Sequence, residues 1–458
     1  MLSKEDNDLL CRVGPGTAMG CLIRDYWIPA LMSSELPEPN GPPERLRLLG
    51  ENLVAFRDSE GRVGILAQSC PHRGASLFFG RNEGGGLRCV YHGWKYDVDG
   101  RCLDMPSEPP ESNPSTGSPN AARQRGSESA GRAGQAFKDK IRATAYPCRE
   151  RGGVIWTYMG TRTTLPPLPD LEPNLLPDGE HQVDKVLREC NWFQGLEGEI
   201  DTSHFGFLHL GKVSPDDAVP GSFDYYMVKD RAPRYVTMDT QFGTSYGAYR
   251  PADEDTYYWR IAHFLFPCFS MIPPGALGRQ ILVRAWVPLD DEHVMFWTMG
   301  TRQPLPGGGQ VDARASNIGQ LFPGTTRSFR YAPNTTDWLG KWRLIPSREN
   351  DYLIDREVQR TSSFTGIDGI HTQDQAITES MGRIADRSGE HLGSSDAMVI
   401  RTRQRVLNAA KALRDHGRTP PGVNNPEVYR VRSGSVVLPR DADWLAATVS
   451  GAAENRSW

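Results

Sequence analysis

The chain lacks any uninterrupted apolar run of about 18 residues, the length that a helix needs to cross a lipid bilayer. Residues 1–8 carry acidic side chains where a secretory signal needs an apolar segment. Neither sign of charge dominates, because 52 Lys and Arg oppose 56 Asp and Glu, for a net charge of -4 at pH 7. Nothing in this balance favours nucleic acid or an anionic membrane as a partner. We therefore expect a cytoplasmic protein that binds neither.

Cysteine is also scarce, at eight in 458 residues, which excludes a disulfide scaffold. No Gly-x-Gly-x-x-Gly follows a predicted strand, so no nicotinamide or flavin site is indicated. The nearest pattern, Gly14-Pro15-Gly16, has a proline in the loop and lacks the third glycine. Electrons for a redox reaction must therefore come from a separate protein.

Length and composition predict a globular enzyme of two or three domains, since 458 residues exceed one ordinary core and 38% are hydrophobic against 24% charged. A boundary is expected where five prolines gather, at residues 161–180. We therefore divide the chain into an N-terminal helical segment at 1–24, a first domain at 25–160, this proline-rich linker, and a second domain at 181–458.

Two mixed pairs of ligating residues stand out in the first domain. Cys70-Pro-His72 and Cys89-Val-Tyr-His92 are separated by 16 residues rich in Gly and Arg. Each pair follows a strand-like segment, which places two thiolates and two imidazoles at the tips of facing loops. Such a set binds a [2Fe-2S] cluster in which two His replace two Cys on one iron. A structural Cys2His2 zinc site is the alternative, although its usual spacing pairs Cys with Cys and His with His.

The rest of the first domain is typical of short strands and turns, which favours a small all-β sandwich. A short helix is expected at residues 3–12, with Ser3 as its N-cap. Strands are expected at 45–49, 53–57, 63–67 and 153–158. The remaining cysteines are expected to be reduced packing residues: Cys11, Cys21, Cys102, Cys148, Cys190 and Cys268.

One segment does not fit this sandwich. Residues 107–136 contain no Val, Ile, Leu, Met or aromatic residue. They cannot bury enough apolar surface to offset the entropy of ordering, so we expect a disordered surface loop. A tolerated insertion and a partner-binding segment are both open interpretations.

The second domain mixes helical and strand patterns, which indicates an α+β domain. Helices are expected at 191–204, 370–386 and 401–415, and strands at 257–266, 280–287 and 293–299.

Two histidines near the start of this domain, His204 and His209, form the second candidate site. Non-haem Fe(II) sites use two His and one carboxylate on one face of the metal. On a straight helix the two side chains would lie about 140° apart and could not share a metal. Gly206 between them allows the helix to end or a π-type bulge to form, and either would bring His209 back. A core or capping role for each His is the alternative.

The carboxylate of such a site must come from elsewhere in the chain. In the predicted helix at 370–386, Asp374 heads an apolar stripe with Ile377 and Met381, whereas Glu379 falls about 120° or more away. An acid aimed at a core needs a cationic partner. A metal and a buried Arg both satisfy that need.

Residues 70–100, CPHRGASLFFGRNEGGGLRCVYHGWKYDVDG, resemble the cluster segment of Rieske non-haem iron oxygenases, above all those grouped with the phthalate dioxygenase oxygenase component. The likeness extends over nearly the whole chain, although most of 107–136 departs from it. It implies an N-terminal all-β Rieske domain and a C-terminal α+β catalytic domain with a helix-grip-like antiparallel sheet. It also implies two cofactors, a [2Fe-2S] Rieske cluster and a mononuclear Fe(II).

The resemblance also assigns roles to residues. It gives Asp374 as the third ligand beside His204 and His209, and Asp201 as a catalytic relay that joins an iron-ligand His to a cluster-ligand His of the neighbouring chain. A plain surface role for Asp201 is the alternative. The cluster ligands that it implies are Cys70, His72, Cys89 and His92.

The expected reaction is oxygenation with O2 of an aromatic, carboxylated small molecule, by dioxygenation, monooxygenation or dealkylation. The expected partners are a flavin and iron-sulfur NAD(P)H-dependent reductase and further copies of the chain, in a homotrimer or stacked trimers. A carboxylate would need a buried Arg, for which Arg250, Arg260 and Arg284 are available although structural roles suit them too. The alternatives are a Rieske electron-transfer protein without its own oxygenase site and a zinc-stabilised scaffold.

Overall fold

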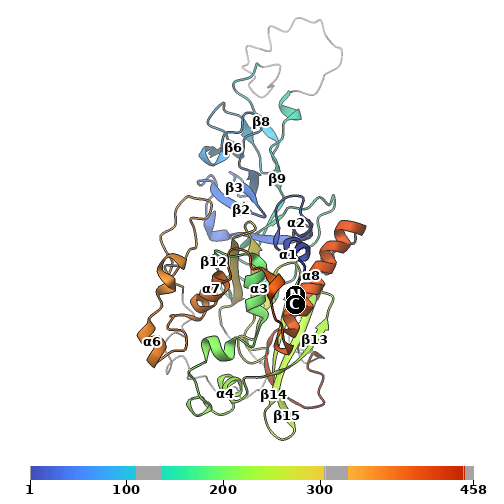
Figure 1. Ribbon diagram of the computed structural model, residues 1–458. Helices are drawn as coiled ribbons and strands as arrows, with labels where there is room; N and C mark the ends of the chain where they lie inside the picture. Colours follow the sequence, from blue (N-terminus) through green and yellow to red (C-terminus); the bar gives the residue numbers. More distant parts are fainter. Residues whose placement is uncertain (1, 110–136, 304, 306–328, 447, 449–458) are drawn as a thin grey trace, which may run out of the picture.

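The computed structural model describes the chain except residues 1, 110–136, 304, 306–328, 447 and 449–458 (Figure 1). Nearly all of the predicted insertion at 107–136 lies outside the described residues. No described helix is long and apolar enough to cross a membrane. The predicted division at 161–180 stays a prediction.

Two small antiparallel sheets form the end of the molecule that carries the cluster motifs (Figure 1). They pack on a shared apolar core that includes Phe56, Leu87 and Trp94. The expected strands are confirmed to within two residues. The first sheet has the order β2 (Glu44–Leu48), β3 (Glu51–Arg57), β4 (Val63–Ala67) and β9 (Ala145–Tyr146), and the second has β5 (Arg81–Glu83), β6 (Gly86–Arg88), β7 (Lys95–Tyr96) and β8 (Cys102–Asp104).

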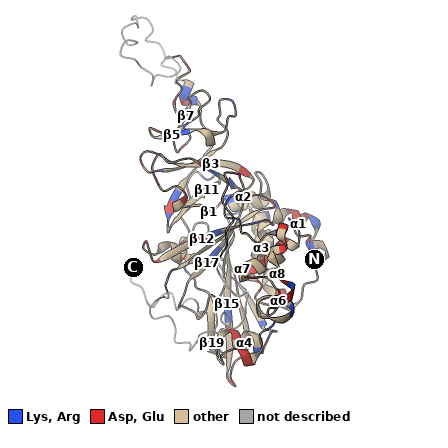
Figure 2. Ribbon diagram, turned by 90° about the vertical axis from the view of Figure 1, so that its left-hand side faces the viewer, with Lys and Arg blue, Asp and Glu red and all other residues tan. Residues whose placement is uncertain are grey.

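A large antiparallel sheet organises the other half of the described chain, as the α+β prediction requires. Its order is β12 (His181–Arg188), β18 (Val294–Thr301), β17 (Leu282–Pro288), β16 (Phe269–Met271), β15 (Thr256–Leu265), β14 (Gly243–Pro251) and β13 (Arg234–Asp239), and β19 (Gly434–Pro439) also pairs with β15. Helices cover one side of it (Figure 2). They are α3 (Trp192–Ile200), α7 (Ile370–Ser380) and α8 (Ala397–His416), while α4 (Phe223–Lys229) and α6 (Arg356–Thr361) lie further from the cluster loops.

The N-terminal segment joins the core of this large sheet. Helix α1 (Lys4–Cys11) is capped by Ser3 as predicted. Helix α2 (Ala18–Arg24) lies in the predicted helical segment at 1–24, although its own bounds were not predicted, and it packs against α8. A third small sheet, in the order β1 (Trp27–Met32), β11 (Val154–Tyr158) and β10 (Cys148–Arg151), shares one hydrophobic core with the large sheet.

Several helix bounds and one burial prediction differ from the sequence analysis. Helix α3 ends at Ile200, four residues before its predicted end, and α7 ends at Ser380 because Gly382 takes a φ of +96° that stops the helix. Helix α8 is longer than predicted at both ends. Cys21 is exposed on α2, so its assignment as a packing residue was wrong.

A buried ion-pair cluster fixes α3, which leads to the candidate site, against α8. Glu197 accepts hydrogen bonds from Arg387, with 2.8 Å to Nη2, and from Arg403 on α8. The side chains of Arg387 and Arg403 are 0% and 5% exposed. Removing one partner of such a cluster leaves uncompensated buried charge.

We predict that Glu197→Gln lowers the free energy of unfolding by about 3 kcal/mol, because the buried Arg387 guanidinium loses its carboxylate partner, whereas Arg403 keeps Glu390. Chemical denaturation measures this change. The control is Glu357→Gln, whose partner Arg360 and the carboxylate itself are both exposed on the surface of α6, so little change is expected. Equal shifts in the two variants would contradict the role given to the buried cluster.

Candidate metal centres

The two cluster motifs sit on matching loops. Cys70 N–H donates to Ala75 O and Cys89 N–H to Trp94 O, each at 2.8 Å, so that each loop closes on itself around its cysteine. Both loops lie beside the apolar core that the two small sheets share, and both cysteines are buried in that core. The four predicted cluster residues therefore come from two similar turns at one end of the molecule (Figure 1).

The side chains of these loops are arranged as a pair of thiols and a pair of imidazoles. Burial and the neighbouring Cys70 raise the pKa of the Cys89 thiol, so two thiolates here require a cation. The rings of His72 and His92 lie 4.5 Å apart between centroids. A pair of thiols and a pair of imidazoles suit a two-iron cluster, in which each pair binds one iron.

Aromatic groups surround this arrangement. The Tyr96 hydroxyl lies 3.3 Å from Cys70 Sγ, and Trp94 stacks on His72 with centroids 4.2 Å apart. Phe79 and Tyr91 are exposed beside the loops, at 64% and 56%. The thiol side is thus enclosed and the imidazole side reaches an apolar surface.

The second candidate site begins where α3 ends. Asp201 is the C-cap of α3, and residues Phe205–His209 form a π-helical turn in which Leu210 N–H donates to Phe205 O. This wider turn brings His209 Nε2 to 3.2 Å from His204 Nε2. Of the two possibilities expected at Gly206, a helix end and a π-type bulge, the structure has the π-type turn, and the straight-helix angle of about 140° does not apply.

Asp374 of α7 completes this group of three. Its Oδ1 lies 3.5 Å from His204 Nε2 and 3.2 Å from His209 Nε2. Burial raises the pKa of Asp374, but the imidazoles of His209 and His204 outweigh it and hold that pKa well below its usual range. Burial lowers the pKa of His204, whereas the carboxylates of Asp374 and Asp201 raise it to about 9.

These three ligand atoms can hold one metal ion. They lie within 4.8 Å of one another. Two imidazoles and one carboxylate on the same side are the donor set of non-haem Fe(II) sites, which leave the opposite positions open. Sequence reasoning predicted all three residues, and the structure brings them together.

Each histidine is held from behind by a different group. His204 Nδ1 contacts the backbone carbonyl of Asp201 and lies 3.8 Å from its carboxylate. His209 Nδ1 lies 2.7 Å from Oε1 of Gln373. Sequence reasoning named Asp201 but missed Gln373, which no spacing or periodicity marks.

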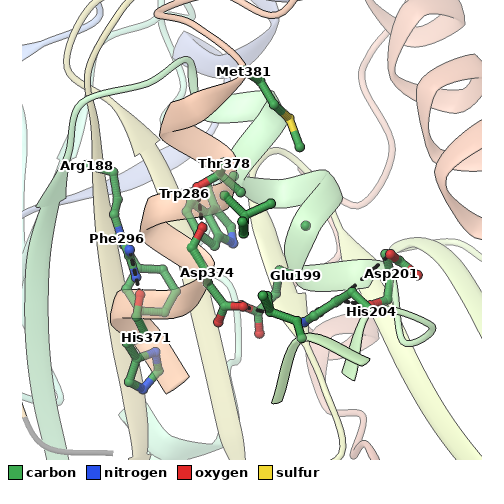
Figure 3. Close-up of a pocket in the computed structure, with 14 residues that line it drawn as sticks. Arg188, Glu199, Asp201, His204, Trp286, Phe296, His371, Asp374, Thr378 and Met381 are labelled. Atoms are coloured by element: carbon green, nitrogen blue, oxygen red, sulfur yellow. Dashed lines mark hydrogen bonds and ion pairs between the residues drawn. The ribbon is translucent and has the colours of Figure 1, made fainter. Parts of the chain in front are cut away.

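A pocket opens beside the group of three (Figure 3). Its walls are mainly apolar, with Trp286 and Phe296 from the sheet and Leu208 from the π-helical turn. In Figure 3 the Asp374 carboxylate points toward His204 at one side of this pocket. The charged side chains in its lining are Arg188, Glu199, Asp201 and Asp374.

The surroundings of α7 correct part of the sequence interpretation. Ile377 and Met381 were expected to face a core, yet they are 43% and 53% exposed and line the pocket. Glu379 was placed away from that stripe, yet it is fully buried and accepts hydrogen bonds from the Tyr352 hydroxyl at 2.6 Å and from Glu189 N–H at 2.8 Å. The reason is that α7 is covered by other segments on the side opposite the pocket.

The three candidate arginines differ in their contacts. Arg284 is paired with Glu199, which gives it a structural partner. Arg260 on β15 donates from Nε to Thr202 Oγ1 at 2.8 Å, and Arg250 on β14 donates from Nε to the backbone carbonyl of Asp230. Within the described residues, Nη1 of both Arg250 and Arg260 is buried without a hydrogen-bond partner.

Each half of the chain matches a known protein family. The family described as Rieske [2Fe-2S] domain matches residues 26–119, and the family described as LigXa C-terminal domain like matches residues 157–457.

Two relatives align over almost their full length. The chain is 46% identical to the 3-chlorobenzoate-3,4-dioxygenase oxygenase subunit of Comamonas testosteroni, over 98% of each protein. It is 35% identical to the phthalate 4,5-dioxygenase oxygenase subunit of Pseudomonas putida, over 97% of this chain and 94% of the relative. Among solved structures, dicamba monooxygenase bound to dicamba shares the fold, with a TM-score of 0.53 at 16% identity, over 86% of this chain and 100% of that one.

Proposed function

The chain belongs to the Rieske non-haem iron oxygenases, as the oxygenase component of a multicomponent system, and we propose from this premise that it oxygenates a carboxylated aromatic ring. Its cofactors are a [2Fe-2S] Rieske cluster and a mononuclear iron. The observation that carries the proposal is a group of two His and one Asp beside an apolar pocket, in a chain that also has the two cluster loops.

The described side chains fit both cofactors. In the proposal Cys70, His72, Cys89 and His92 hold the cluster, and His204, His209 and Asp374 hold the iron. When bound, the cluster supplies single electrons and the iron supplies the chemistry that activates O2. The residues of the chain position the ligands, exclude water and orient the aromatic substrate.

Electrons come from a separate reductase in the proposal, one that carries flavin and an iron-sulfur centre and oxidises NAD(P)H. The relatives are named as oxygenase subunits, which implies other components that feed them electrons.

The relay from cluster to iron is proposed to cross between two copies of the chain. The cluster loops lie at one end of the molecule, whereas α3 and α7 lie near its middle in both views (Figures 1 and 2). The exposed Phe79 and Tyr91 beside the cluster give an apolar surface that a second copy can cover, and Phe207 and Phe364 are exposed on the catalytic half. We therefore propose a homotrimer, alone or stacked, in which Asp201 joins His204 to His72 or His92 of the next chain.

Asp201→Asn tests this relay. We expect both metals to stay bound while oxidation of the reduced cluster, after substrate and O2 are added, slows by about 10- to 100-fold, because an outer partner of a metal ligand loses its charge. Stopped-flow absorbance of the cluster measures the rate. Asp216→Asn, an exposed acid near the same turn, is the control with unchanged kinetics, and normal cluster oxidation in Asp201→Asn would remove Asp201 from the relay.

The proposed substrate class rests on the names of the relatives and on the charge of two buried arginines. The relatives include oxygenase subunits named for 3-chlorobenzoate and phthalate, and a dioxygenase subunit alpha named for phenoxybenzoate. Burial and then the charge of Arg260 lower the pKa of Arg250 to about 10, so two buried guanidinium groups repel each other. An anion between them would remove that repulsion.

Arg188 lines the pocket and Arg260 does not, but Arg260 lies against the Phe205 ring, which is next to His209. The Arg260 guanidinium lies 5.4 Å from the centroid of the Phe205 ring, and that ring lies 5.0 Å from the ring of His209. The Phe205 ring thus lies between the guanidinium and a proposed iron ligand. Burial lowers the pKa of Arg188, and the carboxylates of Glu379, Asp374 and Glu199 offset only part of that effect. We propose that Arg260, supported by Arg250, receives the substrate carboxylate.

Arg260→Gln should raise KM for benzoate-type acids by about 30-fold or more, because a buried charge pair is lost. Steady-state oxygen consumption with a surrogate reductase measures this, with the matching amide as a neutral substrate. Arg234→Gln, on an exposed position of β13, is the matched control. An equal KM for the acid in both variants would contradict the carboxylate site.

A further inference from the structure

The side chain of Gln373 lies between α7 and the π-helical turn. It is 2% exposed, and its Oε1 lies 2.7 Å from His209 Nδ1. Its amide Nε2 donates to the backbone carbonyl of Ile367 at 2.9 Å. The second contact fixes the orientation of the amide, because only the nitrogen can donate to a carbonyl oxygen.

This orientation determines which nitrogen of His209 carries the proton. An amide oxygen can only accept, so Nδ1 of His209 must be the donor. Nε2 is then left with its lone pair, directed toward Asp374 Oδ1 at 3.2 Å and His204 Nε2 at 3.2 Å. That is the tautomer that a metal ligand requires.

The two histidines are therefore oriented from different parts of the chain. His204 is held by the backbone carbonyl of Asp201, three residues before it. His209 is held by a residue 164 positions later, next to Asp374 on α7. Helix α7 thus supplies both the Asp374 carboxylate and the Gln373 amide that orients His209 on the π-helical turn.

We propose that Gln373 is a positioning residue of the iron site, which fixes the tautomer and ring angle of His209 and thereby sets the affinity for Fe(II). This inference rests on the proposed function, since it takes His209 as a ligand. A purely structural role, in which Gln373 holds α7 to the loop before it through Ile367, is the competing explanation.

Two substitutions separate these roles. Gln373→Met keeps the length of the side chain and removes both polar contacts. Gln373→Glu keeps an oxygen acceptor for His209 Nδ1 but loses the donor to Ile367. Gln375→Met is the control, because Gln375 is 4% exposed on the same helix and its Oε1 has no hydrogen-bond partner among the described residues.

The measurement is anaerobic titration with Fe(II) of each chain after its mononuclear iron has been removed and its cluster retained. We expect Gln373→Met to bind Fe(II) about 10- to 100-fold more weakly than the wild type, because a lost outer partner of a ligating His has that effect on metal affinity. Gln373→Glu and Gln375→Met should bind comparably to the wild type. Co(II) spectra should change in Gln373→Met and return in Gln373→Glu.

Circular dichroism and thermal unfolding report folding of the catalytic half in every variant, and the cluster absorbance reports that the cluster is retained. Equal Fe(II) affinity in Gln373→Met and Gln375→Met would overturn the inference, as would Gln373→Glu binding as weakly as Gln373→Met. If Gln373→Met does not fold, Gln373→Glu decides: wild-type affinity supports the role through His209, and weak binding refutes it. A wild-type chain that binds no Fe(II) would instead refute the proposed function.

Discussion

The catalytic half depends on one irregular turn. A regular helix would direct His209 away from His204, and the single wider turn at Phe205–His209 puts their Nε2 atoms 3.2 Å apart. Asp374 then reaches both from α7, and the buried Glu197 cluster holds α3, which leads into the turn, against α8. The site thus combines one locally unusual backbone segment with two helices that conventional packing keeps in place.

The cluster half and the catalytic half of the chain differ in the charges around their metal sites. The cluster loops enclose thiols and leave imidazoles near an apolar surface, which suits electron entry and exit through histidine. The catalytic half places negative charge at Asp374 and an unbalanced positive pair at Arg250 and Arg260. A cationic metal is complementary to the Asp374 site, and the large sheet supplies apolar residues, Trp286 and Phe296, to the pocket beside it.

The sequence predicted features whose signal is local. Cys70, His72, Cys89 and His92 stand in a recognisable spacing, and Gly206 lies within the π-helical turn, one of the two possibilities that the sequence allowed there. Long-range features were not predictable: the exposure of Ile377 and Met381 and the burial of Glu379 depend on which segments cover α7. The orienting contact of Gln373 joins positions 164 apart, and such a contact leaves no periodic pattern in the sequence. The bounds of α2 were not predicted because this helix is short and packs against α8, far along the chain.

Metal analysis with low-temperature EPR, on the dithionite-reduced wild type beside His204→Ala, tests the central claim most directly. The account predicts about three irons per wild-type chain, and about two in the variant with the same Rieske-type signal, since the cluster holds two irons and the His204 site one. Equal iron content in both proteins would contradict the ligand assignment at His204. Zinc in place of iron, with no Rieske-type signal, would contradict the account of both centres.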